Sequence, residues 1–197
     1  MARFGTWAAD VIAELFPTYP SVLAEDRITY RPHQRSTRQL LHIDSTYGYP
    51  TEGRGMLRLF CNVDPTGRPA SMAGRRAVRV LRPPVRLGGA RTRGRMAESW
   101  SSRLKIRRGR RTLYDEVIAE IRRLGKRDKA YQRSAPREIV EFLSGSSWLA
   151  ITDLVPHGAI SGRHSLDQTF FLPATGMSDP HRSSLYILEK LTGRRLA

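Results

Sequence analysis

Short runs of alternating apolar and polar residues are the feature that most limits the folds open to this chain of 197 residues. Residues 56–63 (MLRLFCNV) are the clearest example, since every second residue from Leu57 onward is apolar and would share one face of a strand. Strands are also predicted at 26–32, 35–44, 138–143, 148–155 and 161–173. Helices are predicted at 6–16, at 113–125 ending at Gly125, and at 184–193 ending at Gly193. The pattern predicts a mainly β fold with flanking helices, as in a jelly-roll or cupin-like double sheet.

Positive charge is concentrated in one segment of the chain. The formal net charge is +16, and residues 71–111 hold 14 Lys or Arg against a single acid, Glu98. That segment therefore carries +13 and leaves about +3 for the other 156 residues. We expect a single domain over 1–197 with an atypical Arg-rich insert or loop at 71–111. The insert is open to three interpretations: a solvated loop, a patch for an anionic partner, or the product of a shifted reading frame.

The cysteine count and the N-terminus favour a cytoplasmic location. Cys61 is the one cysteine, which excludes an internal disulfide framework and fits a reducing compartment. The first 16 residues contain two acids and no small-residue cleavage site, so we expect no signal peptide. No apolar run approaches the roughly 20 residues that span a bilayer.

Two residues in the run LLHID form half of a candidate metal site. On a strand, His42 and Asp44 would point to one face, and Leu41 and Ile43 would point to the packed face. A second histidine would complete the two-histidine, one-carboxylate set of non-haem iron(II) oxygenases, which leaves three coordination positions open. His157, after the predicted strand 148–155, is the first candidate. The runner-up is His164. Ordinary hydrogen-bonding residues at strand ends remain the alternative.

Several polar residues are candidates for binding a dicarboxylate cosubstrate. Arg58 lies within the apolar strand 56–63, where a guanidinium is costly to bury without an anionic partner. A carboxylate fits that guanidinium in a bidentate fashion, although a salt bridge to a protein acid or an exposed strand edge would explain Arg58 equally well. Gln168 and Thr169 could add hydrogen bonds to the same ligand, or be ordinary strand residues. Arg163 is a second basic candidate, in a setting typical of an exposed turn.

Longer blocks of the sequence resemble a known family. LLHIDSTYGYPTEGRGMLRLFCNVDPTGRP, LYDEVIAEI, KAYQR, SGSSWLAITDLVPHGAISGRHSLDQTFFLP and SLYILEKLTGRRL occur in the order found in the Kdo hydroxylases and cover roughly two-thirds of the chain. The Kdo hydroxylases act on the sugar acid Kdo of the lipopolysaccharide inner core. Relative to that family, the chain has less sequence before the H-x-D motif, and residues 71–111 do not resemble it.

The resemblance implies a double-stranded β-helix and an enzyme that needs Fe(II), 2-oxoglutarate and O₂. It implies that His42, Asp44 and His157 bind the iron and that Arg58 binds the 2-oxoglutarate carboxylate, with Gln168 as a further candidate. The implied reaction hydroxylates C3 of a Kdo residue in Kdo-containing lipid A and yields the sugar Ko. The enzyme would then lie at the cytoplasmic face of the inner membrane, in peripheral contact with anionic lipid.

A second function class is a non-catalytic basic module that binds nucleic acid or anionic lipid through 71–111. Outside that segment, basic residues are not interleaved with aromatic ones as a stacking surface for nucleic acid would require. We therefore expect the hydroxylase and no nucleic-acid partner.

Overall fold

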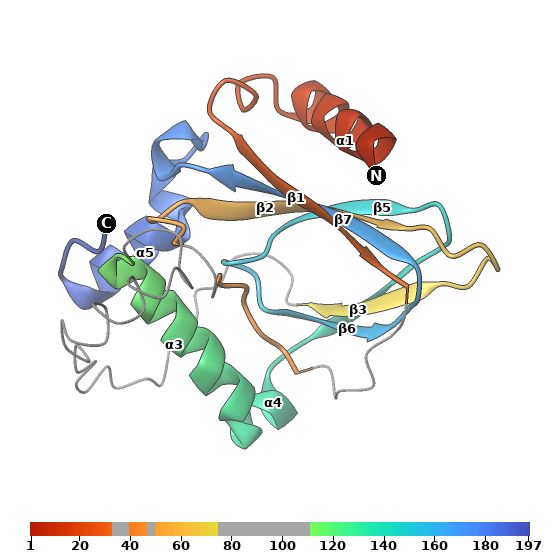
Figure 1. Cartoon of the computed structure of the whole chain (residues 1–197). Coiled ribbons are helices and arrows are strands. Elements are labelled where there is room, and N and C mark those ends of the chain that lie inside the picture. The colour runs from red at the N-terminus through yellow and green to blue at the C-terminus, as the bar shows by residue number, and fades with distance from the viewer. Residues whose placement is uncertain (33–39, 47–49, 75–110) are drawn as a thin grey trace, which may run out of the picture.

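Two antiparallel sheets form the centre of the molecule (Figure 1). The computed structural model describes residues 1–32, 40–46, 50–74 and 111–197. In these residues the larger sheet has the strand order β1-β7-β2-β5 and the smaller one the order β4-β3-β6. The strands are β1 (Ala24–Arg31), β2 (Gly55–Asn62), β3 (Ala70–Gly74), β4 (Glu138–Phe142), β5 (Ser147–Ile151), β6 (His157–Ser161) and β7 (Ser165–Leu172). The predicted mainly β architecture with flanking helices is confirmed.

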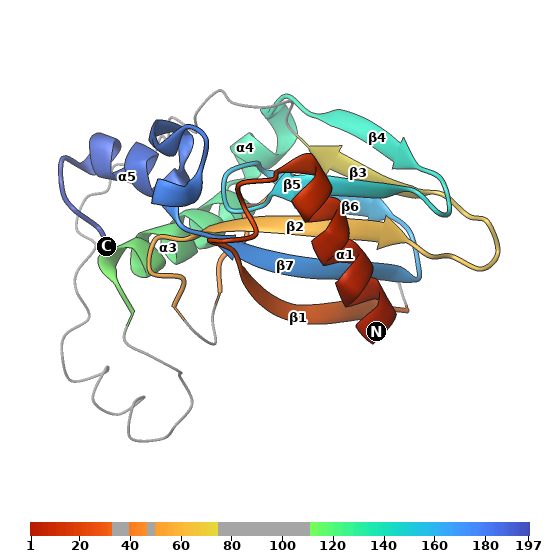
Figure 2. The ribbon, with the colours of Figure 1, turned by 90° about the horizontal axis from the view of Figure 1, so that it is seen from above.

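Helices cover one face and one end of the sheets. They are α1 (Ala2–Leu15), α3 (Leu113–Arg127), α4 (Lys129–Ser134) and α5 (Ser184–Thr192), with short 3-10 turns η1 (Ala174–Gly176) and η2 (Pro180–Arg182). Figure 2 shows α1 lying across the outer face of the larger sheet, and α3 and α5 at the end of the strands. As predicted, α5 ends at Gly193, whose positive φ of 66° closes the helix in the left-handed conformation.

The alternation of β2 divides the larger sheet into an outer and an inner face. Leu59 packs outward with Ile12 of α1 and Phe170 of β7 in one buried cluster. The residues between these outward positions point to the smaller sheet, so Arg58 and Phe60 face the space between the two sheets. Strand β2 therefore supplies a core on one side and a polar site on the other.

The start of α3 is fixed by one buried carboxylate. Asp115 accepts bonds from the Thr112 amide (3.0 Å) and hydroxyl (2.9 Å), which completes a capping box at the first turn. Its other oxygen accepts from the Thr51 amide (2.7 Å) and hydroxyl (3.0 Å). Asp115 thereby links α3 to the chain just before β2.

Some predicted boundaries are wrong. In the described part of 35–44, His42 makes a single β-bridge instead of a strand. Residues 71–74, at the start of the expected insert 71–111, belong to β3, and 75–110 lie outside the described residues. Helix α3 continues past Gly125 to Arg127 because a glycine inside a helix costs only about 1 kcal/mol relative to alanine.

Two long predicted strands are also interrupted. The run 148–155 leaves the sheet after Ile151, and the run 161–173 contains a turn between β6 and β7. In that turn Gly162 has a φ of 124° and lies against Ala70, so that a Cβ at this glycine would meet the Ala70 Cβ at 2.7 Å.

Replacing Phe170 with alanine should test the packing of α1 on the sheet. The ring is only 1% exposed, so Phe170→Ala should lower the free energy of unfolding by about 3–5 kcal/mol. Urea denaturation measures this, with Leu143→Ala as a control because Leu143 is 64% exposed. Equal midpoints for the two variants would contradict the assignment of this core.

Candidate metal and cosubstrate site

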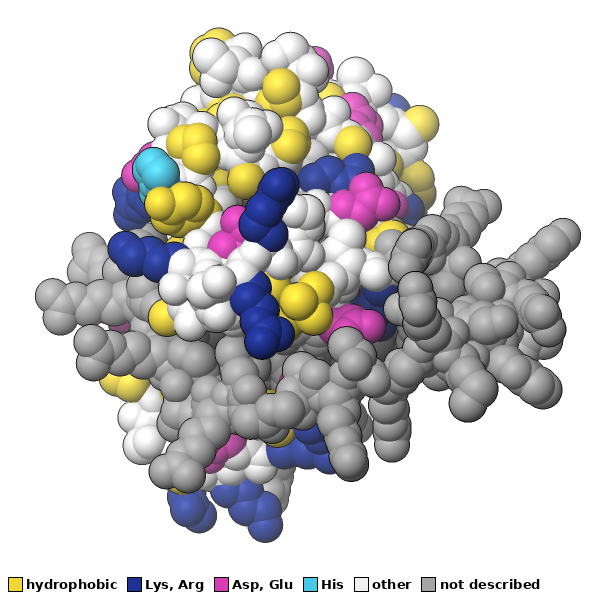
Figure 3. Space-filling model, turned by 90° about the vertical axis from the view of Figure 1, so that its left-hand side faces the viewer, with side chains coloured by type: hydrophobic (Ala, Val, Ile, Leu, Met, Phe, Trp, Pro, Cys, Tyr) yellow, Lys and Arg dark blue, Asp and Glu magenta, His cyan; other side chains and the backbone are white. Residues whose placement is uncertain are grey.

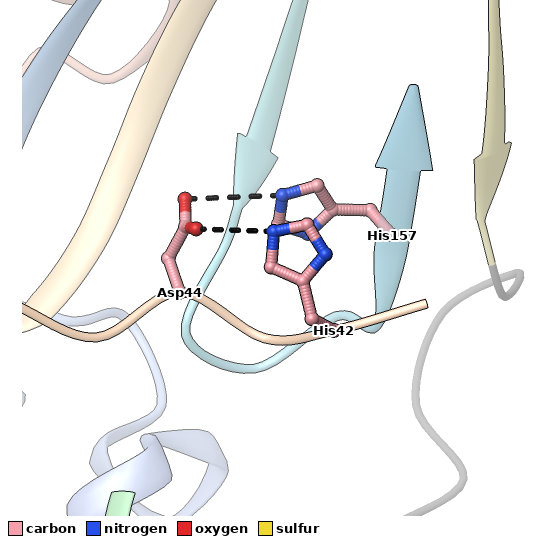
Figure 4. Close-up of side chains that lie close together, drawn as sticks. All are labelled: His42, Asp44 and His157. Atoms are coloured by element: carbon pink, nitrogen blue, oxygen red, sulfur yellow. Dashed lines mark ion pairs between the residues drawn. The ribbon is translucent and has the colours of Figure 1, made fainter. Parts of the chain in front are cut away.

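Three side chains from two distant parts of the chain meet between the sheets. His42 and Asp44 come from one extended segment, and His157 begins β6 (Figure 4). Each offers one ligand atom, and these atoms lie within 4.8 Å of one another. His42 Nε2 is 3.7 Å from Asp44 Oδ1, and His157 Nε2 is 3.8 Å from Asp44 Oδ2. The structure therefore brings together the three residues expected to form a metal site.

Backbone contacts fix which nitrogen each histidine presents. Nδ1 of His42 donates to the Leu40 carbonyl at 2.8 Å, and Nδ1 of His157 donates to the Val155 carbonyl at 2.9 Å. With Nδ1 protonated, each neutral ring has its Nε2 lone pair directed to the Asp44 side. A histidine that binds a metal through one nitrogen commonly donates the other N–H to a carbonyl in this way.

A reciprocal backbone bridge holds the segment that carries His42 and Asp44, which we call the ligand segment (residues 41–45). The His42 amide donates to the His157 carbonyl and the His157 amide donates to the His42 carbonyl, both at 2.9 Å. The Asp44 amide donates to the Thr152 carbonyl at 2.7 Å. Leu41 and Ile43 are buried in two separate clusters. The prediction that these two residues pack inward while His42 and Asp44 share the other side therefore holds, although the segment is not a full strand.

Burial and charge leave the three side chains in the protonation states that a metal ion needs. Burial lowers the pKa of His42 to about 4 and also lowers the pKa of His157. Burial alone would raise the pKa of Asp44, but the neighbouring His157 and Arg58 lower it to about 2. At neutral pH the site thus has two neutral imidazoles and one carboxylate, and this donor set suits Fe(II).

Arg58 is bound by two acids. Its Nη1 donates to Asp44 Oδ2 at 2.7 Å, and its Nη2 donates to Asp167 Oδ1. Arg31 Nε lies 3.1 Å from the other oxygen of Asp167. Arg58 therefore does form salt bridges to protein acids, which was the alternative explanation for a buried arginine at this position. Arg58 Nε is buried without a hydrogen-bond partner among the described residues.

Three other candidates lie away from the triad. Gln168 faces outward on β7 because it pairs with the outward-facing Leu59. There its side-chain amide donates to Glu25 at 3.1 Å. Arg163 is exposed in the turn before β7. In the same turn, His164 contacts the Tyr30 hydroxyl at 2.7 Å. The structure thus does not support a role at this site for any of the three.

Sequence reasoning missed Asp167 and named only its neighbours Gln168 and Thr169. Asp167 is 1% exposed and lies on the inward face of β7 opposite Phe60, while Thr169 pairs with Arg58. An acid inside a run that ends in TFFL is a signal for a buried ion pair. The face of β7 could not be assigned until its register with β2 was known.

Lowered histidine pKa values predict metal binding that resists acid. Two histidines with ordinary pKa values near 6.5 would lose about a hundredfold in affinity between pH 7.5 and 5.5. His42, with a pKa of about 4, stays neutral over this range, and the lowered pKa of His157 acts in the same direction. Titration with Co(II), followed by its visible absorption, should show a loss of less than about tenfold. A hundredfold loss in a protein that stays folded would contradict the environment described for these rings.

Comparison with known proteins shows which family the chain belongs to. The model of the 3-deoxy-D-manno-oct-2-ulosonic acid (Kdo) hydroxylase family matches residues 1–195. None of the curated proteins matches the chain.

Solved structures of the Kdo hydroxylase KdoO, a non-heme Fe(II) alphaketoglutarate dependent dioxygenase, are similar over nearly the whole chain. For the complex with alphaketoglutarate and Fe(III), the identity is 29% and the TM-score 0.85, with 99% of this chain and 69% of that chain covered. For the complex with succinate and Fe(III), the identity is 30% and the TM-score 0.84, with 98% and 68% covered. For the cobalt(II) complex, the identity is 29%, the TM-score 0.84 and the coverage 98% and 68%. On this evidence the chain belongs to the Kdo hydroxylase family.

Proposed function

We propose that this protein is an Fe(II)- and 2-oxoglutarate-dependent dioxygenase that hydroxylates Kdo. The observation that carries the proposal is the meeting of two neutral imidazoles and one carboxylate in a chain of the Kdo hydroxylase family. The similar KdoO structures hold Fe(III) with alphaketoglutarate or with succinate, the cosubstrate and coproduct of such a reaction.

In this proposal His42, Asp44 and His157 are the protein ligands of the iron. Iron and 2-oxoglutarate, when bound, would supply the activation of O₂, coupled to oxidation of 2-oxoglutarate to succinate and CO₂. Three protein ligands would leave coordination positions for the cosubstrate and O₂. The carbonyls of Leu40 and Val155 keep the two rings in the correct tautomer and orientation.

Arg58 would bind a carboxylate of 2-oxoglutarate. It faces the space between the sheets, contacts Asp44 directly and has a buried Nε–H with no partner among the described residues. An unpaired buried N–H costs about 1–3 kcal/mol, and a carboxylate acceptor would remove that cost. Thr169, which pairs with Arg58 on β7, would add a hydrogen bond to the same ligand.

The position of hydroxylation follows from the chemistry of the substrate. Kdo is a 3-deoxy sugar acid, so C3 is a methylene carbon that lacks a hydroxyl group. Oxygen insertion at C3 would give the 3-hydroxylated sugar Ko. We propose Kdo-containing lipid A as the substrate, because the family acts on the lipopolysaccharide inner core.

Such a substrate would place the enzyme against the cytoplasmic face of the inner membrane. None of the helices in the described residues is long and apolar enough to cross a membrane. Figure 3 shows one described face, on which Lys and Arg side chains are mixed with acidic and apolar ones. The basic residues proposed to contact anionic lipid at 75–110 lie outside the described part of the chain.

Single replacements in the triad should abolish turnover. His42→Ala, Asp44→Ala and His157→Ala each remove one of three ligands, so succinate formation should fall by at least about a hundredfold. Anaerobic titration with Fe(II) and 2-oxoglutarate, followed by the visible charge-transfer absorption, tests the site directly. His164→Ala is the matched control and should retain the absorption. A well-folded wild-type protein without this absorption would contradict the proposed function.

Removing the Arg58 guanidinium should weaken the use of 2-oxoglutarate. Arg58→Met keeps most of the side-chain volume but loses the charge, so the KM for 2-oxoglutarate should rise by at least about tenfold. Fe(II) or Co(II) binding measured without cosubstrate should change less. An unchanged KM would remove Arg58 from the cosubstrate site.

A further inference from the structure

One row of side chains on α3 continues from the core toward the metal triad. Ile118 is buried, and the residues four and eight positions later, Arg122 and Lys126, are only partly exposed. The neighbouring Arg123 and Arg127 are exposed. The two half-buried cations therefore lie on the side of α3 that faces the protein.

Contacts place this side of α3 beside the ligand segment. Arg122 Nη1 donates to the Ser45 carbonyl at 3.4 Å, next to Asp44. The Gln132 amide nitrogen donates to the carbonyls of Leu41 and Gly125, both at 2.8 Å, and its oxygen accepts from the Leu41 amide at 2.9 Å. The part of α3 around Gly125 thus lies alongside residues 41–45 (Figure 1). Arg122 and Lys126 are the partly exposed cations of this part of the helix.

The two cations share one side of α3, next to the segment that carries His42 and Asp44. Burial and the nearby charge of Arg122 lower the pKa of Lys126, against the attraction of Asp44. Two like charges four residues apart on a helix repel each other, and an anion bound between them would relieve the repulsion.

The family substrate provides an anion at a suitable distance from the reacting carbon. In 3-deoxy-D-manno-oct-2-ulosonic acid the carboxylate is C1 and the methylene is C3. One carbon separates them, so they lie about 2.5 Å apart. A cation that holds the carboxylate must therefore be close to the metal, while the free N–H of Arg58 is already assigned to 2-oxoglutarate.

We propose that Arg122 and Lys126 form the binding site for the C1 carboxylate of Kdo and thereby present C3 to the metal centre. This inference rests on the proposed function and adds the residues that recognise its substrate. Lys126 is the better residue to test, because Arg122 also contacts the Ser45 backbone and has a structural role.

The test is a comparison of two ligands that differ only in charge. The methyl ketoside of Kdo carries the C1 carboxylate, and its C1 methyl ester does not. Binding is measured anaerobically by calorimetry with Fe(II) and 2-oxoglutarate present, for the wild type, Lys126→Gln, Lys126→Arg and the control Arg127→Gln. The wild type and Arg127→Gln should bind the acid at least about tenfold more tightly than the ester. Lys126→Gln should lose most of this preference, and Lys126→Arg should keep much of it.

Other outcomes identify which idea fails. If Lys126→Gln discriminates between acid and ester as well as the wild type does, the proposed carboxylate site is wrong. If Lys126→Gln instead weakens the Fe(II)–2-oxoglutarate absorption, the residue belongs to the cosubstrate site and the inference is also wrong. If the wild type forms that absorption but binds neither ligand, Kdo is not its substrate and both proposals fall. If the wild type forms no absorption, the dioxygenase proposal has failed independently of Lys126.

Discussion

The reciprocal backbone bridge between His42 and His157 is the interaction on which the site depends. It joins the described segment 40–46, which is not itself a strand, to the first residue of β6, and each of the two bridged residues carries one imidazole of the triad. The packing of Leu41 and Ile43 into separate clusters then fixes the rotation of this segment, so Asp44 must face the same side as His42. Backbone pairing sets the distance between the rings, and packing sets their direction.

Charge is balanced within the buried part of the site. Asp44 and Asp167 each carry one negative charge, while Arg58 and the half-exposed Arg31 each carry one positive charge. A divalent cation alone would leave two uncompensated positive charges in a region of low dielectric, which is costly. A cosubstrate with two carboxylates restores neutrality. The same charge balance gives Arg58 and Lys126 different roles. The substrate carboxylate is an anion in addition to the two carboxylates of the cosubstrate, so it needs a cation that is not already part of this balanced set.

The sequence predicted those features that follow from local periodicity. The shared face of His42 and Asp44, the position of Arg58 on the face opposite Leu57 and Leu59, and the terminal helix 184–193 all depend on spacing within one short run. Features that depend on register or on interruption of a run were missed. Gln168 was named and Asp167 was not, because a shift of one residue exchanges the two faces of a strand and only the pairing with β2 sets that register. The turn that separates β6 from β7 contains Gly162, and Arg163 was expected in an exposed turn, yet the run 161–173 was predicted as one strand. His164 in this turn also has a positive φ, of 51°, without being glycine.

Gln132 has a consequence for the dynamics of the ligand segment. Its side-chain amide pairs with both the N–H and the C=O of Leu41, as a neighbouring strand would, while the next residue, His42, pairs with true strand backbone. Two adjacent amides are therefore protected from hydrogen exchange by different elements of the fold. Undocking of α4 exposes the Leu41 amide alone, whereas the His42 amide exchanges only when the bridge to β6 opens. The relative exchange rates of these neighbours thus separate motion of the helical support from opening of the metal site itself.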